Sequence, residues 1–162
     1  MSIRSLTSQL GEALVERHWQ VVCAESCTGG GVAFELSAVA GCSRWFDRAF
    51  VAYSNDAKNE TLGVSHSLMI EHGAVSSACV AAMAAGALER SSAQFAMAAS
   101  GVAGPGGGSE EKPVGTVWMA WQVEGNAALT RKVWFAGDRD EIRGQTIRAL
   151  LQGALEQVQA KI

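Results

Sequence analysis

Residues 21–31 read Val21-Val22-Cys23-Ala24-Glu25-Ser26-Cys27-Thr28-Gly29-Gly30-Gly31, and this stretch decides the fold of the chain. Its apolar start predicts a buried strand over residues 19–25, and helical periodicity follows over residues 28–39. Ser26 is therefore expected on a strand-to-helix turn, clear of the sheet. The N–H groups of Thr28, Gly29 and Gly30 are expected to open the helix, where unpaired donors attract negative charge. A serine beside such donors is half of an acyl-transfer site.

The rest of the chain alternates between helix and strand patterns. Helices are expected over residues 3–17, 55–62, 65–72, from the Ser76-Ser77 cap to about residue 90, and from Asp138 to about residue 160. Strands are expected over residues 48–53, 94–100, 114–123 and 128–135. This order predicts an α/β fold of three layers, with helices on both faces of a mixed, mainly parallel sheet of about five strands. A length of 162 residues fits one domain over residues 1–162.

Composition narrows the class of partner. The chain is 48% hydrophobic and 18% charged with a net charge of -3, which is typical of a soluble globular protein. We therefore expect no nucleic-acid partner and no membrane partner, and any bound anion must be small. Arg4, Glu12, Glu16 and Arg17 interrupt any signal-peptide core, so a cytoplasmic protein is predicted. The four cysteines contain no Cys-x-x-Cys pair, which indicates free thiols and no metal site.

Ser26 needs a base, and the segment Tyr53-Ser54-Asn55-Asp56-Ala57-Lys58 offers one. Lysine can act as a base when burial keeps its amine neutral. If the first two strands are neighbours, their carboxyl ends bring Ser26 and Lys58 to one edge of the sheet, where open parallel sheets bind ligands. Tyr53 could orient Lys58 or relay a proton. Spacing alone leaves open a helix-capping serine and a surface lysine.

Other nucleophiles and bases are less favoured. Cys27 is a second candidate nucleophile, because a thiol at a helix N-terminus ionises readily. The three histidines, His18, His66 and His72, lie at helix ends and have no catalytic setting.

A second glycine-rich loop follows the strand at 94–100 and contains Gly104, Gly106, Gly107 and Gly108. It does not match the Walker P-loop. It does not match the dinucleotide fingerprint either, because this chain has Ser109 where the fingerprint has its third glycine. It is either a flexible loop or a backbone cradle for an anion. Together the two glycine turns predict a small phosphorylated ligand. Arg139 and Arg143 are either solvated or contact a phosphate across a dimer interface, and Trp45-Phe46 either packs in the core or stacks on a ligand.

Several segments together resemble the nicotinamide-nucleotide amidase family, the C-terminal domain of CinA-type proteins. They are Glu25-Ser26-Cys27-Thr28-Gly29-Gly30, Tyr53-Ser54-Asn55-Asp56-Ala57-Lys58, His72-Gly73-Ala74-Val75-Ser76, Ser100-Gly101-Val102-Ala103-Gly104-Pro105, Lys112-Pro113-Val114-Gly115-Thr116-Val117 and Gly137-Asp138-Arg139. The resemblance spans about residues 5–160. Ser100 stands where members commonly have threonine, and the chain resembles the stand-alone form that lacks an N-terminal domain.

The resemblance implies hydrolysis of nicotinamide mononucleotide to nicotinic acid mononucleotide and ammonia, without a cofactor or a metal. It makes Ser26 the nucleophile and Lys58 its base, with Tyr53 assisting. The expected substrate-binding residues are Thr28, Gly29, Gly30, Ser100, Gly101, Gly104, Gly106 and Gly107. The small-residue helix before residue 90 makes a homodimer or higher homo-oligomer plausible. Two alternatives stay open: a non-catalytic nucleotide-binding module, and a serine amidohydrolase with another substrate.

Overall fold

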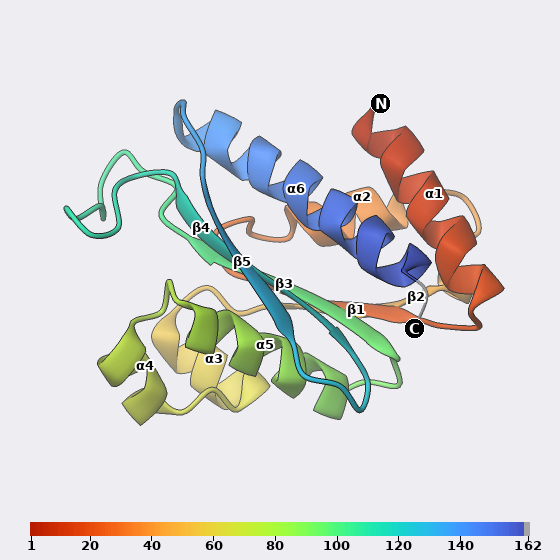
Figure 1. The fold of residues 1–162 in the computed structure, drawn as a ribbon, viewed down its shortest axis with the longest axis horizontal. Helices are drawn as coiled ribbons and strands as arrows, with labels where there is room; N and C mark the ends of the chain where they lie inside the picture. Colours follow the sequence, from red (N-terminus) through yellow and green to blue (C-terminus); the bar gives the residue numbers. More distant parts are fainter. Residues whose placement is uncertain (161–162) are drawn as a thin grey trace.

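In a computed structural model, residues 1–160 are described and form six α-helices, one short 3₁₀-helix and five strands (Figure 1). The helices are α1 (Ile3–Glu16), α2 (Gly31–Ser37), η1 (Cys42–Arg44), α3 (Asn55–Leu62), α4 (His66–His72), α5 (Ser77–Glu89) and α6 (Arg139–Gln159). The strands are β1 (Val21–Glu25), β2 (Phe46–Val51), β3 (Phe95–Gly101), β4 (Thr116–Val123) and β5 (Leu129–Trp134).

The five strands form one mixed sheet in the order β2-β1-β3-β4-β5. β1 pairs in parallel with both β2 and β3, whereas β4 is antiparallel to β3 and to β5. Four of the five strands therefore run in the same direction, and β4 alone runs against them. The predicted fold class, a three-layer α/β fold with a mixed and mainly parallel sheet, is confirmed.

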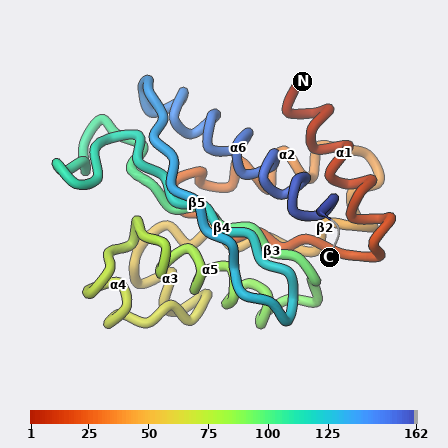
Figure 2. The backbone as a smooth tube through the Cα atoms, in the orientation of Figure 1, coloured from red at the N-terminus to blue at the C-terminus, as the bar shows by residue number. Residues whose placement is uncertain are grey.

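The helices cover both faces of the sheet. α1, α2 and α6 lie on one face and α3, α4 and α5 on the other, with α1 and α6 side by side (Figures 1 and 2). The two-residue period of β1 explains the two cores: Val21 and Cys23 belong to the core under α1 and α6, and Val22 and Ala24 to the core under α5. No side chain of β1 is left in solvent, as expected for a central parallel strand.

Among the element boundaries that differ from the prediction, two lie next to Ser26 and Lys58. The helix expected from residue 28 begins at Gly31, because Gly29 and Gly30 have φ angles of 59° and 100°, in the left-handed region, and form a turn. The strand expected over residues 48–53 is β2, Phe46–Val51, since Val21 at the start of β1 pairs with Phe46. Both shifts lengthen the loops at the carboxyl edge of the sheet. Across residues 1–160, every helix is too short or too polar to cross a lipid bilayer.

Candidate active site

The candidate site lies at the carboxyl edge of the parallel strands. Glu25, the last residue of β1, pairs with Val51 of β2 on one side and with Ala99 of β3 on the other. The chain segments that leave these strands therefore meet at one edge, as parallel topology requires. They carry Ser26 and Tyr53 to the same place as Gly101, the last residue of β3.

Lys58 reaches this edge from α3 and contacts Ser26 directly. Its Nζ lies 2.9 Å from Ser26 Oγ, and it also donates to the backbone carbonyl of Tyr53 at 3.0 Å. Ser26 Oγ is 3.4 Å from the same carbonyl. Both side chains are buried, Lys58 with 2% and Ser26 with 7% of its surface exposed. The alcohol and the amine are thus held in proton-transfer distance, away from bulk water.

Burial changes the chemistry of the amine. Removal from water disfavours the ammonium form and lowers the pKa of Lys58 from its ordinary value of 10.5. The neighbouring thiols of Cys79 and Cys27 act in the opposite direction but do not reverse the shift. A larger fraction of Lys58 is consequently neutral near pH 7 than for a lysine in water, as a general base requires.

Tyr53 contributes two different groups. Its carbonyl holds Lys58, whereas its phenol is half exposed and accepts a hydrogen bond from Arg139 Nη2 at 2.8 Å. Arg139 Nη1 donates to the carbonyl of Gly104 at 2.7 Å. Arg139, from the first turn of α6, therefore links the tyrosine to the second glycine loop. The phenol points to Arg139 and not to the amine.

A cavity of about 300 Å³ opens over Ser26 and Lys58. Eight predicted site residues line it: Ser26, Tyr53, Lys58, Ser100, Gly101, Gly104, Gly106 and Gly107. Further lining residues that sequence reasoning did not assign are Asn55, Ala74, Val75 and Arg139. All four lie within the segments that carry the family resemblance, and that signal could have identified them.

Thr28, Gly29 and Gly30 do not line this cavity. Thr28 is fully buried and donates its hydroxyl to Glu25 at 2.6 Å. The donors at the start of α2 are taken as well, because the Glu25 carboxylate accepts from the amides of Val32 and Ala33. The expectation that this helix end would attract a ligand's charge is corrected: the anion at its start is the protein's own carboxylate.

The alternative catalytic groups fit less well. Cys27 lines the cavity, but burial raises the pKa of its thiol to about 11. The expectation that this thiol ionises readily is therefore wrong. The three histidines are exposed and lie outside the cavity. Trp45 is buried in the core below α1, as the packing alternative predicted.

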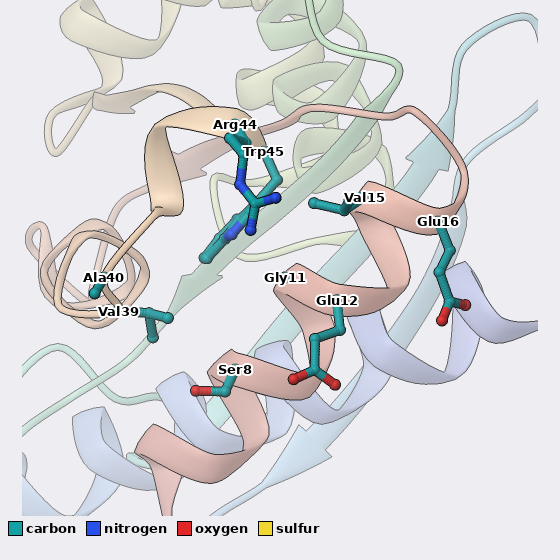
Figure 3. Close-up of a pocket in the computed structure, with 9 residues that line it drawn as sticks. All are labelled: Ser8, Gly11, Glu12, Val15, Glu16, Val39, Ala40, Arg44 and Trp45. Atoms are coloured by element: carbon teal, nitrogen blue, oxygen red, sulfur yellow. The ribbon is translucent and has the colours of Figure 1, made fainter.

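A second cavity, of about 480 Å³, lies between α1 and the α2–η1 segment (Figure 3). Its walls include Glu12, Val15, Arg44 and Trp45, and it contains none of the predicted site residues. Within residues 1–160, no three His, Cys, Asp or Glu side chains gather where they could hold a metal ion. Among the described residues, the predicted nucleophile, the predicted base and the second glycine loop meet at the cavity over Ser26.

The family model of the CinA C-terminal domain matches residues 3–158. This chain belongs to the CinA C-terminal domain family. It is 48% identical over 155 residues to the nicotinamide-nucleotide amidohydrolase PncC of Escherichia coli strain K12, covering 96% of this chain and 94% of that protein. It is 49% identical over 154 residues to the protein of the same name from Pseudomonas putida. The resemblance to the amidase family is therefore confirmed.

Longer proteins and solved structures share the same domain. A CinA-like protein of Akkermansia muciniphila is 45% identical over 143 residues, which cover 88% of this chain but 34% of that protein. The crystal structure of the competence/damage inducible protein CihA from Agrobacterium tumefaciens is 42% identical, covers 97% of this chain and superposes with a TM-score of 0.92. A Klebsiella pneumoniae competence damage-inducible protein A structure, 38% identical over 98% of this chain, gives 0.94.

Proposed function

We propose that this protein hydrolyses the carboxamide of nicotinamide mononucleotide, with Ser26 as nucleophile and Lys58 as general base. One observation carries the proposal: the buried Lys58 Nζ lies 2.9 Å from Ser26 Oγ at the floor of a cavity. A lowered lysine pKa and a serine within reach are what Ser–Lys acyl transfer requires. The activity in the names of the relatives from E. coli and P. putida supports the choice of substrate.

Acylation begins when neutral Lys58 takes the proton of Ser26 and the serine oxygen bonds to the carboxamide carbon. As the C–N bond breaks, the Lys58 ammonium gives that proton to the departing nitrogen, which leaves as ammonia. In the second half, Lys58 takes a proton from water, and the hydroxide attacks the ester. The ester bond to Ser26 breaks, and Lys58 returns the proton to the serine oxygen. The products are nicotinic acid mononucleotide and free enzyme.

The developing oxyanion and the substrate phosphate are assigned to two different loops. Cys27 follows the nucleophile directly and lines the cavity, and we assign its backbone amide to the developing oxyanion. A single such donor contributes about 3 kcal/mol to the barrier. The glycine loop with Gly104, Gly106 and Gly107 lines the cavity beside Arg139, and we assign the substrate phosphate to this loop and to the Arg139 guanidinium.

Tyr53→Phe tests this division of roles. Lys58 keeps its bond to the carbonyl of residue 53, so kcat is expected to stay within about twofold of the wild type. Arg139 loses its phenol partner, and KM for the mononucleotide is expected to rise about fivefold to tenfold. Steady-state kinetics measure both constants. A large fall in kcat at unchanged KM would instead place the phenol in proton transfer.

The substrate is tested by ammonia release from nicotinamide mononucleotide, nicotinamide riboside and nicotinamide. Turnover that depends on the phosphate and disappears in Ser26→Ala supports the proposal. Binding of the mononucleotide without ammonia release would indicate a non-catalytic nucleotide-binding module. Turnover of the two ligands without phosphate at equal or higher rates would indicate a serine amidohydrolase with another substrate.

A further inference from the structure

Glu25 is a buried acidic residue that the mechanism above does not use. It is fully buried, and its backbone is fixed by pairing with Val51 and Ala99 on the two neighbouring strands. Its carboxylate accepts from Thr28 Oγ1 at 2.6 Å, from the amide of Val32 at 2.9 Å and from the amide of Ala33 at 3.0 Å. A buried carboxylate is costly unless every oxygen has a donor, and here both oxygens have one.

The Glu25 carboxylate is stabilised by backbone amides at the N-terminus of α2. None of the ion pairs formed by residues 1–160 includes Glu25, so its partners are the amides, the Thr28 hydroxyl and, at 3.9 Å, the thiol of Cys23. Helices usually begin with a capping side chain at the N-cap position, but the N-cap of α2 is Gly30, which has no side chain to offer. Glu25 caps α2 from the preceding strand, across the turn that carries the nucleophile.

This arrangement encloses Ser26. The bond between Glu25 and Thr28 joins the two residues that flank Ser26 and Cys27, and so closes the turn into a ring. From the other side, Arg143 of α6 donates to the carbonyls of Cys27 and Thr28 at 3.1 and 3.2 Å. The turn is therefore fixed by two charged groups, the Glu25 carboxylate and the Arg143 guanidinium.

We propose that Glu25 is the positioning residue of the nucleophile: its carboxylate sets the turn so that Ser26 Oγ faces Lys58 and the Cys27 amide faces the cavity. This inference rests on the proposed function only in taking Ser26 as the nucleophile. A shift of about 1 Å in a reacting group lowers a rate about 10²-fold. A displaced Ser26 should lower kcat and not raise KM, because the residues assigned to the substrate phosphate lie on another loop.

Glu25→Gln keeps the shape of the side chain but turns an amide NH₂ toward the donors of α2. We expect kcat per folded molecule to fall about 10²-fold, with KM within about threefold of the wild type. Thr28→Val removes the hydroxyl of the ring and should lower kcat about tenfold, whereas Thr28→Ser keeps the hydroxyl and should recover most of the loss. Thr7→Val is the matched control, because Thr7 is a fully buried threonine that donates to the Ile3 carbonyl within α1, outside the site.

A readout that does not depend on the substrate completes the test. The rate at which a fluorophosphonate labels Ser26, followed by peptide mass spectrometry, should fall in parallel with kcat in Glu25→Gln and in Thr28→Val, but not in Thr7→Val. Wild-type labelling and kcat in Glu25→Gln, at equal folded concentration, would overturn the proposal. A wild-type protein that labels at Ser26 but releases no ammonia would overturn only the proposed substrate. A wild-type protein that neither labels nor turns over would overturn both.

Discussion

Lys58 combines two properties that conflict in most proteins. It is a cationic residue type, yet its side chain is 2% exposed and has no carboxylate partner among the ion pairs of residues 1–160. Its contacts are a hydroxyl and a carbonyl, neither of which carries a charge. Such a site favours the neutral amine, so the residue gives up stability for reactivity.

The pH dependence follows from the lowered pKa of Lys58. The protonated amine cannot accept the serine proton, so kcat should fall as pH drops below the folded-state pKa, which lies below 10.5. The stability of the protein should change with pH in the same direction as kcat. Between the folded-state and unfolded-state pKa values of Lys58, the unfolded chain binds more protons than the folded one, so the free energy of unfolding should rise with pH. In Lys58→Met the stability rise should be absent. A kcat that does not fall with decreasing pH anywhere below 10.5, down to the pH at which the protein unfolds, would contradict the assignment.

Helix α3 carries Lys58, and a single side chain caps the N-terminus of this helix. Ser54 is the N-cap, and its hydroxyl accepts from the amide of Ala57 at 3.0 Å. α4 begins in the same way, with Ser65 accepting from the amide of Leu68 at 3.1 Å, but it carries no residue that contacts Ser26. The two helices therefore form a matched pair in which one positions the proposed base and the other does not.

Ser54→Ala and Ser65→Ala should each cost about 1 kcal/mol, because each removes one helix cap. In thermal unfolding this is a fall in Tm of about 2–4 °C for either variant. Ser54→Ala should also lower kcat severalfold, since fraying of α3 displaces Lys58, whereas Ser65→Ala should leave kcat per folded molecule unchanged. An equal effect of both variants on kcat would show that the start of α3 does not matter for the base.

At the scale of the element, the sequence predicted what depends on local pattern. The caps at Ser76 and Asp138 and the helices that follow them were predicted because an N-cap residue lies close to the amides it binds. The start of α2 was not, because its cap comes from Glu25 on the preceding strand, and the positive φ angles of Gly29 and Gly30 keep the intervening turn out of the helix.

At the scale of the whole molecule, α6 connects the core with the site. Its Gly153 packs directly on the Trp121 ring of β4, and the Trp121 indole donates to the Leu150 carbonyl of the same helix at 2.9 Å. Its first two turns carry Arg139 and Arg143, which contact the glycine loop and the nucleophile turn. The packing of this one helix against the sheet therefore determines two contacts at the candidate active site.

Gly153→Ala should destabilise the protein by about 2 kcal/mol, because the added methyl group overlaps the Trp121 ring and α6 must move away from the sheet. Gly144→Ala is the control in the same helix: an added Cβ meets nothing within 4 Å, and the better helix propensity of alanine should add up to about 1 kcal/mol. Urea unfolding of the two variants measures both changes. A neutral Gly153→Ala would show that α6 can shift without cost.

The proximity of Ser26 and Lys58 was predictable because parallel pairing brings the carboxyl ends of β1 and β2 together. The place of Arg139 was not: it contacts Tyr53, 86 positions earlier in the chain, and no periodicity or spacing reports a contact of that range. Sequence left Arg139 between solvent and a dimer interface, whereas the structure places it in the cavity of its own chain. Local motifs predict the proposed reacting pair, and long-range packing determines which residues surround it.

The proposed chemistry depends above all on the Lys58 amine, and ammonia release by Lys58→Met at saturating nicotinamide mononucleotide tests it most directly. Methionine fills a similar volume without a basic group, so the fold should remain, as checked by circular dichroism. We expect kcat to fall about 10³-fold or more, because Ser26 then has no proton acceptor within 3 Å. Ammonia release within about tenfold of the wild-type rate would contradict the role of Lys58 as the base.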